Sequence, residues 1–582
     1  MVRRILGLAT TTLFVLAGAL AYPACGGGGD TAPPDSSDDT TTADVDAAPP
    51  PSAACQALGL KARAWSAGPY GAHRGEIAGD FTLPMLDGTS WTFSTEFSGC
   101  DVYVFIPDTI AISSTNPASV WTKSLGALLI ASPRNVHYFF VSRKSAAAAP
   151  ASLQAMQQQI TDQLAKMSAA DQAQWTPRLH VVQPPAAALG NWVGDALVAQ
   201  ASMGMTIDRR QVIHGVGNLS DVKIPASGSW PWAQDLSYAA NEPIYLNAQS
   251  DELDRLDGEN ATVVTLFQGA VLSEYADVDA TLPSASQMAN FDTLEIEVTQ
   301  QCPNPDAIEE GNCGAWDYLA ELYAGTPVAA GDAGANDAGA NDAGANDAGT
   351  DGGDAGPQYA FTELARFITS YHRETHWVVD VTPMLAVLKD GGPQHFRWSF
   401  APPWNVQPTA TKLSLRLSNQ NKGYKPEAAT YLFSGGDFNS QYNVGRSPAN
   451  VPIPSDAKRV ELYVTVTGHG GATNNCSEFC DHAHEFTVNA AKYTKDFPMA
   501  GTDDGCIAQQ KNGMTPNQSG TWWFGRGGWC PGQQVDPWVT DVTKDVTPGQ
   551  AATISYRGLF NGSDPPDNSG NIDLTSWLVV YH

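Results

Sequence analysis

Acidic, basic and aromatic residues stand beside closely spaced cysteines in the second half of the chain. Ten residues separate Cys302 from Cys313, and Trp316-Asp317-Tyr318 follows shortly afterwards. A disulfide between these two cysteines would restrain the loop and fix Asp317 beside an aromatic ring. Because a carboxylate held in one position can act as a general base, Asp317 is a candidate catalytic residue.

A second carboxylate has a similar setting. Glu478 and Phe479 lie between Cys476 and Cys480, which have three residues between them. Closing this pair would form a very tight loop with Glu478 at its tip. Glu478 is therefore a second candidate, with loop capping through backbone hydrogen bonds as the structural alternative.

The third cysteine pair encloses a candidate cation. The segment between Cys506 and Cys530 ends in Arg526-Gly527-Gly528-Trp529. A guanidinium there could bind a carboxylate or a substrate, or serve as a buried salt-bridge partner. Together the three segments supply one Asp, one Glu, one Arg and several aromatic side chains.

The N-terminus has the pattern of an export signal over residues 1–24. Arg3 and Arg4 precede an apolar run from Ile5 to Ala21, and Ala24-Cys25 resembles a bacterial lipoprotein processing site. We therefore expect a lipidated Cys25 and a cell-envelope location, or else plain secretion. Residues 25–53 contain almost no large apolar side chain, which predicts a disordered tether.

The remaining cysteines fit an oxidising compartment. The chain has nine cysteines, and eight are left once Cys25 is set apart. Six of these form the three closely spaced pairs, and the other two are Cys55 and Cys100. Export makes four disulfides the expectation and thiolate metal binding the minor alternative.

Residues 54–233 are predicted to form an α/β module. Apolar runs at 102–106, 136–141 and 179–182 indicate buried strands, and Leu153, Met156, Ile160, Leu164 and Met167 repeat at helical spacing. Gly79–Gly88 and Ile207-Asp208-Arg209 resemble parts of thioredoxin-like redoxin domains. The redoxin cysteine would follow Ile106, where Pro107-Asp108-Thr109 stands, so we expect a structural or substrate-positioning module without redox chemistry.

From Glu242 onward the pattern predicts antiparallel sheets. Alternating segments at 293–298, 413–417 and 460–467 are separated by Gly, Pro and Asn clusters. The length suits two β-sandwich (jelly-roll) domains, predicted at 242–410 and 411–582. The Asp-Ala-Gly-Ala-Asn repeats within 331–356 predict a low-complexity loop.

The ordered set of motifs from about Glu242 to His582 resembles the peptide-N-glycosidase F family. That family has the same three cysteine pairs in order, a Trp-Asp after the first, a Glu within the second and Arg-x-Gly-Trp-Cys-Pro-Gly at the third. Arg366-Phe367-Ile368-Thr369, Tyr371 and Asp380-Val381-Thr382 also resemble the strand pair between its first two sites.

The resemblance implies an amidase that cleaves the Asn side-chain amide to N-acetylglucosamine in N-glycoproteins or glycopeptides. Asp317 and Glu478 would be catalytic, and a positioned carboxylate needs no metal or other cofactor for this reaction. The implied substrate-binding residues are Trp316, Tyr318, Phe479, Arg526 and Trp529. The implied disulfides join Cys302 to Cys313, Cys476 to Cys480 and Cys506 to Cys530.

This chain departs from the family pattern at three places. Tyr318 replaces an Arg, Phe400-Ala401-Pro402 stands where a third acidic residue is found, and Gly468-His469-Gly470-Gly471 replaces Gly-Trp-Gly-His. These changes affect what the resemblance implies about the catalytic rate, the orientation of the substrate or the glycan bond that is cleaved. A weakened glycan- or glycopeptide-binding protein is therefore an alternative function.

His482 and His484 support another alternative. Side chains two residues apart on a strand share a face, as a His-x-His metal site requires. Copper-dependent peptide-hydroxylating monooxygenases use a double sandwich but need a second histidine cluster. That cluster must lie in the first sandwich, where only the loosely spaced His372, His376 and His395 are available, so a structural histidine pair is the main interpretation.

The net charge of the chain limits the classes of partner it can bind. Lys plus Arg number 32 and Asp plus Glu number 61, which gives a net charge of −29. Such a chain would repel nucleic acid and anionic lipid surfaces. We expect a monomer that binds neutral or cationic partners such as sugars and meets the membrane only through its lipid anchor.

Overall fold

The computed structural model describes residues 53–108, 120–121, 125–199, 204–215, 234–328, 358–470, 477–518, 520–567 and 570–582. The predicted signal peptide, Cys25, almost all of the predicted tether, Cys476 and the loop 331–356 lie outside these ranges. Within them, no helix is both long and apolar enough to cross a membrane.

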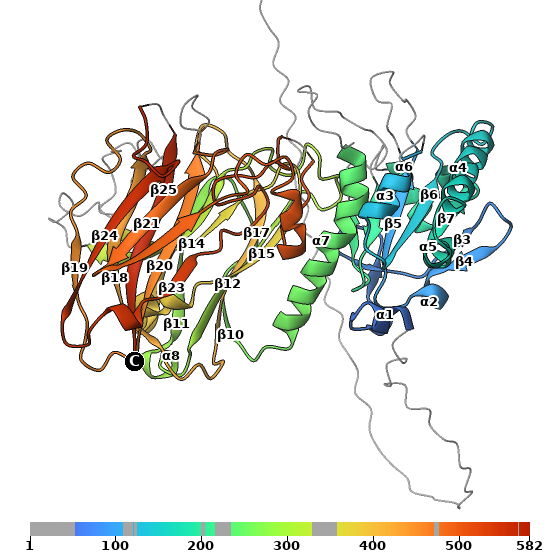
Figure 1. The fold of residues 1–582 in the computed structure, drawn as a ribbon. Helices are drawn as coiled ribbons and strands as arrows, with labels where there is room; N and C mark the ends of the chain where they lie inside the picture. The colour runs from blue at the N-terminus through green and yellow to red at the C-terminus, as the bar shows by residue number, and fades with distance from the viewer. Residues whose placement is uncertain are drawn as a thin grey trace, which may run out of the picture. The chain divides into compact units, whose positions relative to one another are not determined.

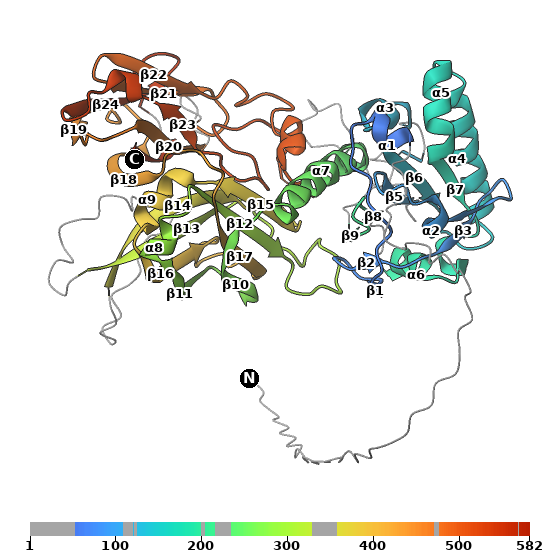
Figure 2. The same ribbon diagram turned by 90° about the horizontal axis from the view of Figure 1, so that it is seen from below.

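The N-terminal part, drawn at the right of Figure 1, contains a five-stranded mixed sheet in the order β7-β6-β5-β8-β9, whose strands are all labelled in Figure 2. Its strands are β5 Val102–Pro107, β6 Val136–Val141, β7 Leu179–Val182, β8 Met205–Ile207 and β9 Ile213–Gly215. β5, β6 and β7 are parallel, whereas β8 pairs antiparallel with β5. All side chains of β5 and β6 are buried, as in parallel strands covered on both faces. The three strands predicted from sequence are confirmed.

Short helices and strands surround this sheet. The helices are α1 Ala53–Ala57, α2 Phe93–Glu96, α3 Leu125–Ala131, α4 Ala149–Leu164, α5 Ala169–Trp175 and α6 Trp192–Ala199. The small strands are β1 Tyr70–Gly71, β2 Ile77–Ala78, β3 Thr82–Pro84 and β4 Ser90–Thr92. The predicted helix is α4, which buries Leu153, Met156 and Ile160. The likeness to redoxins remains a prediction.

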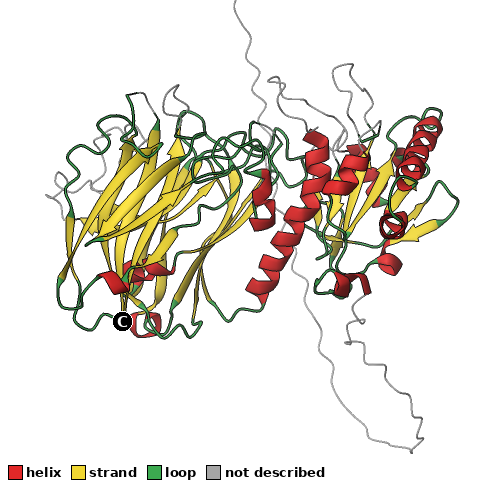
Figure 3. Cartoon of the chain, in the orientation of Figure 1, coloured by secondary structure: helices red, strands yellow, loops and turns green. Residues whose placement is uncertain are grey.

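Helix α7 corrects the predicted start of the all-β region. We predicted sheet from Glu242, but α7 runs from Gln234 to Asp257 and contains Pro243, and the first strand begins at Thr262 (Figure 3). The helix buries Ala239, Tyr245 and Leu246 in an apolar cluster with residues from both the α/β module and the 506–530 segment. A helix packed on more than one side lacks a single apolar stripe, so its periodicity was not recognised.

Two antiparallel four-stranded sheets follow, in the orders β10-β17-β12-β15 and β11-β16-β13-β14. One apolar cluster draws residues from both sheets, so they pack face to face as a sandwich. The strands are β10 Thr262–Leu272, β11 Tyr275–Ser284, β12 Thr293–Gln301, β13 Leu319–Val328, β14 Gln358–Ile368, β15 Thr375–Asp380, β16 Gly391–Ser399 and β17 Thr409–Ser418, with short helices α8 Ala285–Met288 and α9 Leu385–Leu388.

The last two sheets have the orders β18-β25-β20-β23 and β19-β24-β21-β22, and Figure 2 shows them as separate layers. Their strands are β18 Pro426–Asp437, β19 Ala449–Pro452, β20 Arg459–His469, β21 His482–Val488, β22 Ala491–Asp496, β23 Trp538–Asp541, β24 Ala551–Phe560 and β25 Asn571–Tyr581. The predicted boundary at 410/411 falls inside β17, which pairs with β10 and β12 of the first sandwich.

Disulfides connect the loops as the cysteine pattern predicted. Cys55 bonds to Cys100, Cys302 to Cys313 and Cys506 to Cys530. Cys480 is also in a disulfide, but Cys476 lies outside the described residues, so this pairing stays a prediction.

Candidate active site

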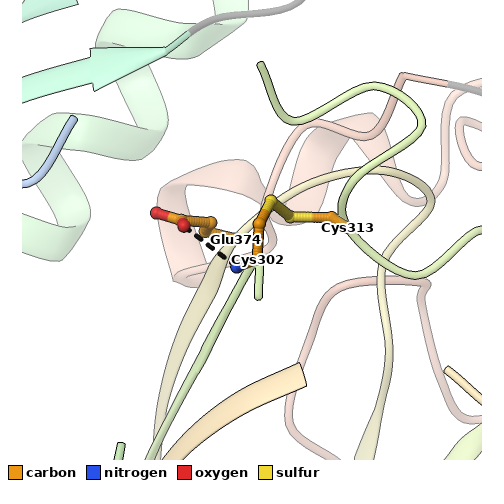
Figure 4. A group of neighbouring side chains, drawn as sticks. All are labelled: Cys302, Cys313 and Glu374. Carbon is orange, nitrogen blue, oxygen red and sulfur yellow. Dashed lines mark hydrogen bonds between the residues drawn. A yellow bond between two sulfur atoms is a disulfide. The ribbon is translucent and has the colours of Figure 1, made fainter. Parts of the chain in front are cut away.

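Asp317 lies on the connection between β12 and β13, just beyond the Cys302–Cys313 disulfide. The two Cα atoms of that disulfide are 4.4 Å apart. The Cys302 amide donates a hydrogen bond to the Glu374 carboxylate at 3.0 Å (Figure 4), and the Cys313 amide donates to the Glu309 carbonyl at 2.8 Å. The loop is therefore fixed before the chain reaches Asp317.

Thr369, immediately after β14, secures the backbone on both sides of Asp317. Its hydroxyl donates to the Trp316 carbonyl at 2.6 Å and accepts from the Tyr318 amide at 2.8 Å. The Thr369 amide donates to the Tyr318 carbonyl at 2.9 Å. These bonds fix the backbone that carries the Asp317 side chain.

Arg526 brings Asp317 and Glu478 together. Its Nη2 lies 3.6 Å from Oδ2 of Asp317, and its Nε lies 3.1 Å from Oε1 of Glu478. The Arg526 side chain is 1% exposed, whereas those of Asp317 and Glu478 are 17% and 19% exposed. Arg526 also donates to the carbonyls of Thr521 and Phe524. The cation is thus enclosed behind two carboxylates that reach solvent.

Burial changes the proton affinity of both carboxylates. It raises the pKa of Asp317, against the opposing effects of the Tyr371 hydrogen bond and the charge of Arg526. Burial likewise raises the pKa of Glu478, with Arg526 opposing it and the nearby Asp317 charge adding to it. Raised carboxyl pKa values beside a specific cation are typical of groups that transfer protons.

Tyr371 belongs to the site, although the sequence analysis did not select it as a site residue. Its hydroxyl hydrogen-bonds to Asp317, and burial together with that carboxylate raises the pKa of Tyr371. A Cβ atom at Gly520 would lie 2.6 Å from the Tyr371 ring, so the absent side chain makes room for it. The sequence signal for Tyr371 is its position two residues after the segment Arg366-Phe367-Ile368-Thr369.

The aromatic residues have unequal access to solvent. Trp316 is 49% exposed, whereas Trp529 is only 5% exposed and donates its indole N–H to the Gly468 carbonyl at 2.7 Å. The guanidinium carbon of Arg526 lies 4.8 Å from the Trp529 ring centre and 5.0 Å from that of Phe479. Trp529 therefore supports Arg526 from behind, and Trp316 is the ring open to a ligand.

Tyr318 is tied to the loop after β16. Asn405 donates a hydrogen bond to the Tyr318 hydroxyl at 2.6 Å, and Gln407 accepts one from the Ala315 amide at 2.7 Å. Phe400, at the start of the same loop, is fully buried in the core. A small pocket is lined by residues that include Gly314, Trp316, Thr369, Phe400 and Gln407, whereas Asp317, Glu478 and Arg526 are not part of its lining.

His482 and His484 share one face of β21 as predicted, but three of their four ring nitrogens are engaged by each other and by Tyr556. His482 Nδ1 is 2.8 Å from His484 Nε2, and His484 Nδ1 is 2.7 Å from the Tyr556 hydroxyl. Burial lowers the pKa of His482 to about 4. A metal would have to displace these hydrogen bonds, which favours a structural pair. His376 and His395 pair separately with Glu297 and Asp279.

Sequence comparison finds the same relationship that the motifs indicated. Residues 437–579 match the family model described as Peptide-N-glycosidase F, C terminal. The peptide-N(4)-(N-acetyl-beta-D-glucosaminyl)asparagine amidase F of Elizabethkingia miricola is 22% identical over 307 residues, which cover 50% of this chain and 73% of that protein.

Solved structures give weaker matches. The crystal structure of peptide-N(4)-(N-acetyl-beta-D-glucosaminyl)asparagine amidase shares 18% identity over 55% of this chain and 96% of its own, with a TM-score of 0.41. PNGF-II shares 14% identity over 57% of this chain and 68% of its own, with a TM-score of 0.40. Because these scores are low, the fold described above rests on its own sheet order. The sequence matches make residues 437–579 a domain similar to the C-terminal domain of peptide-N-glycosidase F, within a chain distantly related to that amidase.

Proposed function

We propose that this protein is an amidase that hydrolyses the bond between an Asn side chain and N-acetylglucosamine in N-glycoproteins or glycopeptides. The observation that carries this proposal is the pair Asp317 and Glu478, supplied by different sandwiches and held by one buried arginine. The match of residues 437–579 to the peptide-N-glycosidase F C-terminal family supports it.

The reaction needs an activated water and a proton for the leaving group. Asp317 is restrained by Thr369 and by the hydrogen bond from Tyr371. It would take a proton from water while the water oxygen attacks the amide carbonyl carbon. The C–N bond then breaks, and the proton passes to the nitrogen of the departing glycosylamine. The products are an Asp side chain and the glycosylamine.

The other residues would orient the substrate and balance charge. Glu478 reaches solvent and can accept hydrogen bonds from sugar hydroxyls or from the amide. The Arg526 side chain is buried, so its role is to fix the two carboxylates and offset their charge. Trp316 offers an exposed indole on which an apolar sugar face can stack.

The cellular setting follows from the same proposal. Glycoproteins are outside the cytoplasm, and the N-terminal pattern with Cys25 fits a lipid-anchored envelope protein that meets them there. The test is labelling with a fatty-acid analogue, which Cys25→Ala should abolish. Labelling that survives this substitution would contradict the anchor.

The proposed reaction is tested by incubating the protein with an N-glycopeptide and recording the peptide mass. We expect Asn to be converted to Asp by the wild type and not by Asp317→Asn. Asp573→Asn is a matched control, because Asp573 faces another buried arginine, Arg366, and it should retain activity. Peptide that keeps its glycan with the wild type would contradict the amidase.

Two observations favour a second candidate, a glycan-binding protein with weak catalysis. The segment Phe400-Ala401-Pro402 stands where the family has a third acid and contains no carboxylate, and its Phe400 is buried in the core. Tyr318 is engaged by Asn405. Binding of intact glycopeptide without glycan release, measured by calorimetry, would support this candidate.

A further inference from the structure

Helix α7 joins the α/β module to the segment that bears Arg526. Its Ala239, Ala240, Tyr245 and Leu246 belong to one apolar cluster. That cluster also contains, from the α/β module and from the 506–530 segment, Leu128, Tyr138, Cys506, Met514, Trp522 and Cys530. Because the cluster is continuous, the α/β module and the candidate site share a core.

A buried charge network extends from this helix. Glu242 of α7 is fully buried and accepts two hydrogen bonds from Arg373, from Nη1 at 3.0 Å and Nη2 at 2.7 Å. The Nε of Arg373 lies 2.5 Å from Glu309, which is in the Cys302–Cys313 loop. Arg373 Nη1 also donates to the Pro516 carbonyl at 2.8 Å. One guanidinium thus ties α7 to two loops of the site.

Tyr371 is only two residues from Arg373 and depends on the same segment. The Tyr371 amide donates to the Asn517 side chain at 2.6 Å, and its carbonyl accepts from the Gln518 amide at 3.1 Å. Tyr245 of α7 and Met514 belong to the same apolar cluster. The segment 515–518 is therefore held to α7 through Arg373 and through the packing of the adjoining Met514, and it in turn holds Tyr371.

The α/β module also holds the Cys302–Cys313 loop directly. Arg74, next to β2, places its Nε 3.0 Å from Glu374 and donates from Nη1 to the Ala307 carbonyl at 2.6 Å. Glu374 is the residue whose carboxylate accepts the Cys302 amide (Figure 4). The module thus holds the loop that precedes Asp317 from outside the sandwiches.

The charges around Arg373 explain what α7 contributes. The buried guanidinium lies between Glu309 of the Cys302–Cys313 loop and Glu242 of α7, and burial raises the pKa of Glu309 to about 7, so this partner is partly neutral near pH 7. Glu242 completes the neutralisation of a buried guanidinium, and removing one partner of a buried ion pair leaves an uncompensated charge.

We propose that the α/β module and α7 complete the candidate active site, with Glu242 acting as a positioning residue that holds Tyr371, and through it Asp317, by way of Arg373. This inference rests on the proposed function. It assigns the N-terminal region a positioning role that the two sandwiches do not provide.

The test compares two full-length variants that each remove one α7 ion pair. Glu242→Gln breaks the pair with Arg373, whereas Glu295→Gln breaks the pair between β12 and Arg255 of α7, about 20 Å farther along the helix. We expect Glu242→Gln to lower kcat about tenfold to a hundredfold with little change in KM, because small displacements of catalytic groups are costly. Glu295→Gln should leave kcat unchanged.

A pH profile separates positioning from mere loss of stability. The Tyr371 hydrogen bond lowers the pKa of Asp317, so a displaced Tyr371 should move the acidic limb of kcat/KM to higher pH. Glu242→Gln and Tyr371→Phe should show this shift, and the double variant should shift no further than Tyr371→Phe alone. An unshifted acidic limb in Glu242→Gln would overturn the inference.

Hydrogen–deuterium exchange provides a readout without activity. Faster exchange at 302–318 and 369–374 in Glu242→Gln, but not in Glu295→Gln, would support positioning even if the wild type released no glycan, in which case only the proposed function fails. Unchanged exchange in those segments would contradict the inference. Should Glu242→Gln not fold, Glu242→Asp keeps the charge but shortens the side chain that reaches Arg373, and it should give a smaller change of the same kind.

Discussion

Two buried arginines at the sandwich junction face carboxylates in different ways. Arg366 on β14 lies 2.8 Å from both Glu363 and Asp573 and 3.3 Å from Glu321, and it donates to the Thr467 hydroxyl at 2.8 Å. Arg526 faces Asp317 and Glu478, which both reach solvent. The chemical groups are the same, and the first set also reaches solvent, since the side chains of Asp573 and Glu321 are 22% and 14% exposed. The two sets differ in how many carboxylates share the cation.

Three carboxylates around Arg366 would leave an excess of negative charge in a buried place, and burial raises the pKa of Glu321 to about 8. One proton therefore resides there near pH 7, which suits a structural cluster. Around Arg526 two partly exposed carboxylates share one cation, an arrangement that can exchange protons with water. The number of carboxylates around each cation, three against two, distinguishes the structural ion cluster from the candidate active site.

The largest expected effect tests whether Arg366 is a structural cation. Arg366→Met leaves three carboxylates without their cation, so we expect the free energy of unfolding to fall by about 3–5 kcal/mol. Arg526→Met should cost less stability, because it leaves two carboxylates rather than three without a cation, yet it should lose more activity. Denaturant unfolding and kcat measure the two properties. Equal stability losses would remove the distinction.

A second comparison uses one glutamate from each cluster. Glu478→Gln should lower kcat about a hundredfold, the usual cost of removing one preorganised polar group from an active site. Glu363→Gln, which changes the partner of Arg366, should leave kcat unaffected. Steady-state kinetics on an N-glycopeptide decides this, and a similar loss in both variants would place Arg366 in the catalytic machinery.

The pH dependence of stability sharpens the contrast. Because the pKa of Glu321 is raised from 4.5 to about 8, its contribution is present at low pH and is lost as pH rises through 8. We expect a loss of up to about 1.4 kcal/mol per pH unit between these two pKa values, where the folded state holds a proton that the unfolded state has released. Glu321→Gln should flatten this part of the curve, measured by denaturant unfolding from pH 5 to pH 9. A curve with the same slope in both proteins would show that Glu321 does not carry the proton.

The smallest effect concerns the rim of the site. Tyr318→Phe removes the acceptor of the Asn405 hydrogen bond, which is worth about 0.5–1.5 kcal/mol. We expect KM for the glycopeptide to rise a few-fold with kcat preserved. A large fall in kcat would instead give Tyr318 a direct part in the reaction.

The strands and the cysteine-framed loops were predictable because each leaves a local signal. Buried strands such as β5 and β6 are short apolar runs, and Cys302 and Cys313 enclose a loop that can close on itself. The start of the all-β region was misplaced, because α7 packs on more than one side and contains Pro243. The spacing of apolar residues reveals a helix that has a single buried face, and this signal is weak where a helix has several buried faces.

The sequence alone determined which residues could do chemistry: Asp317, Glu478 and Arg526 stand out by type and by their neighbouring cysteines. Only the tertiary structure decided how they act together. It enclosed Arg526 and Trp529, left Trp316 exposed and brought Tyr371 to Asp317. The physical reason is that burial and ion pairing depend on segments far apart in the chain, so exposure and proton affinity are properties of the packed fold.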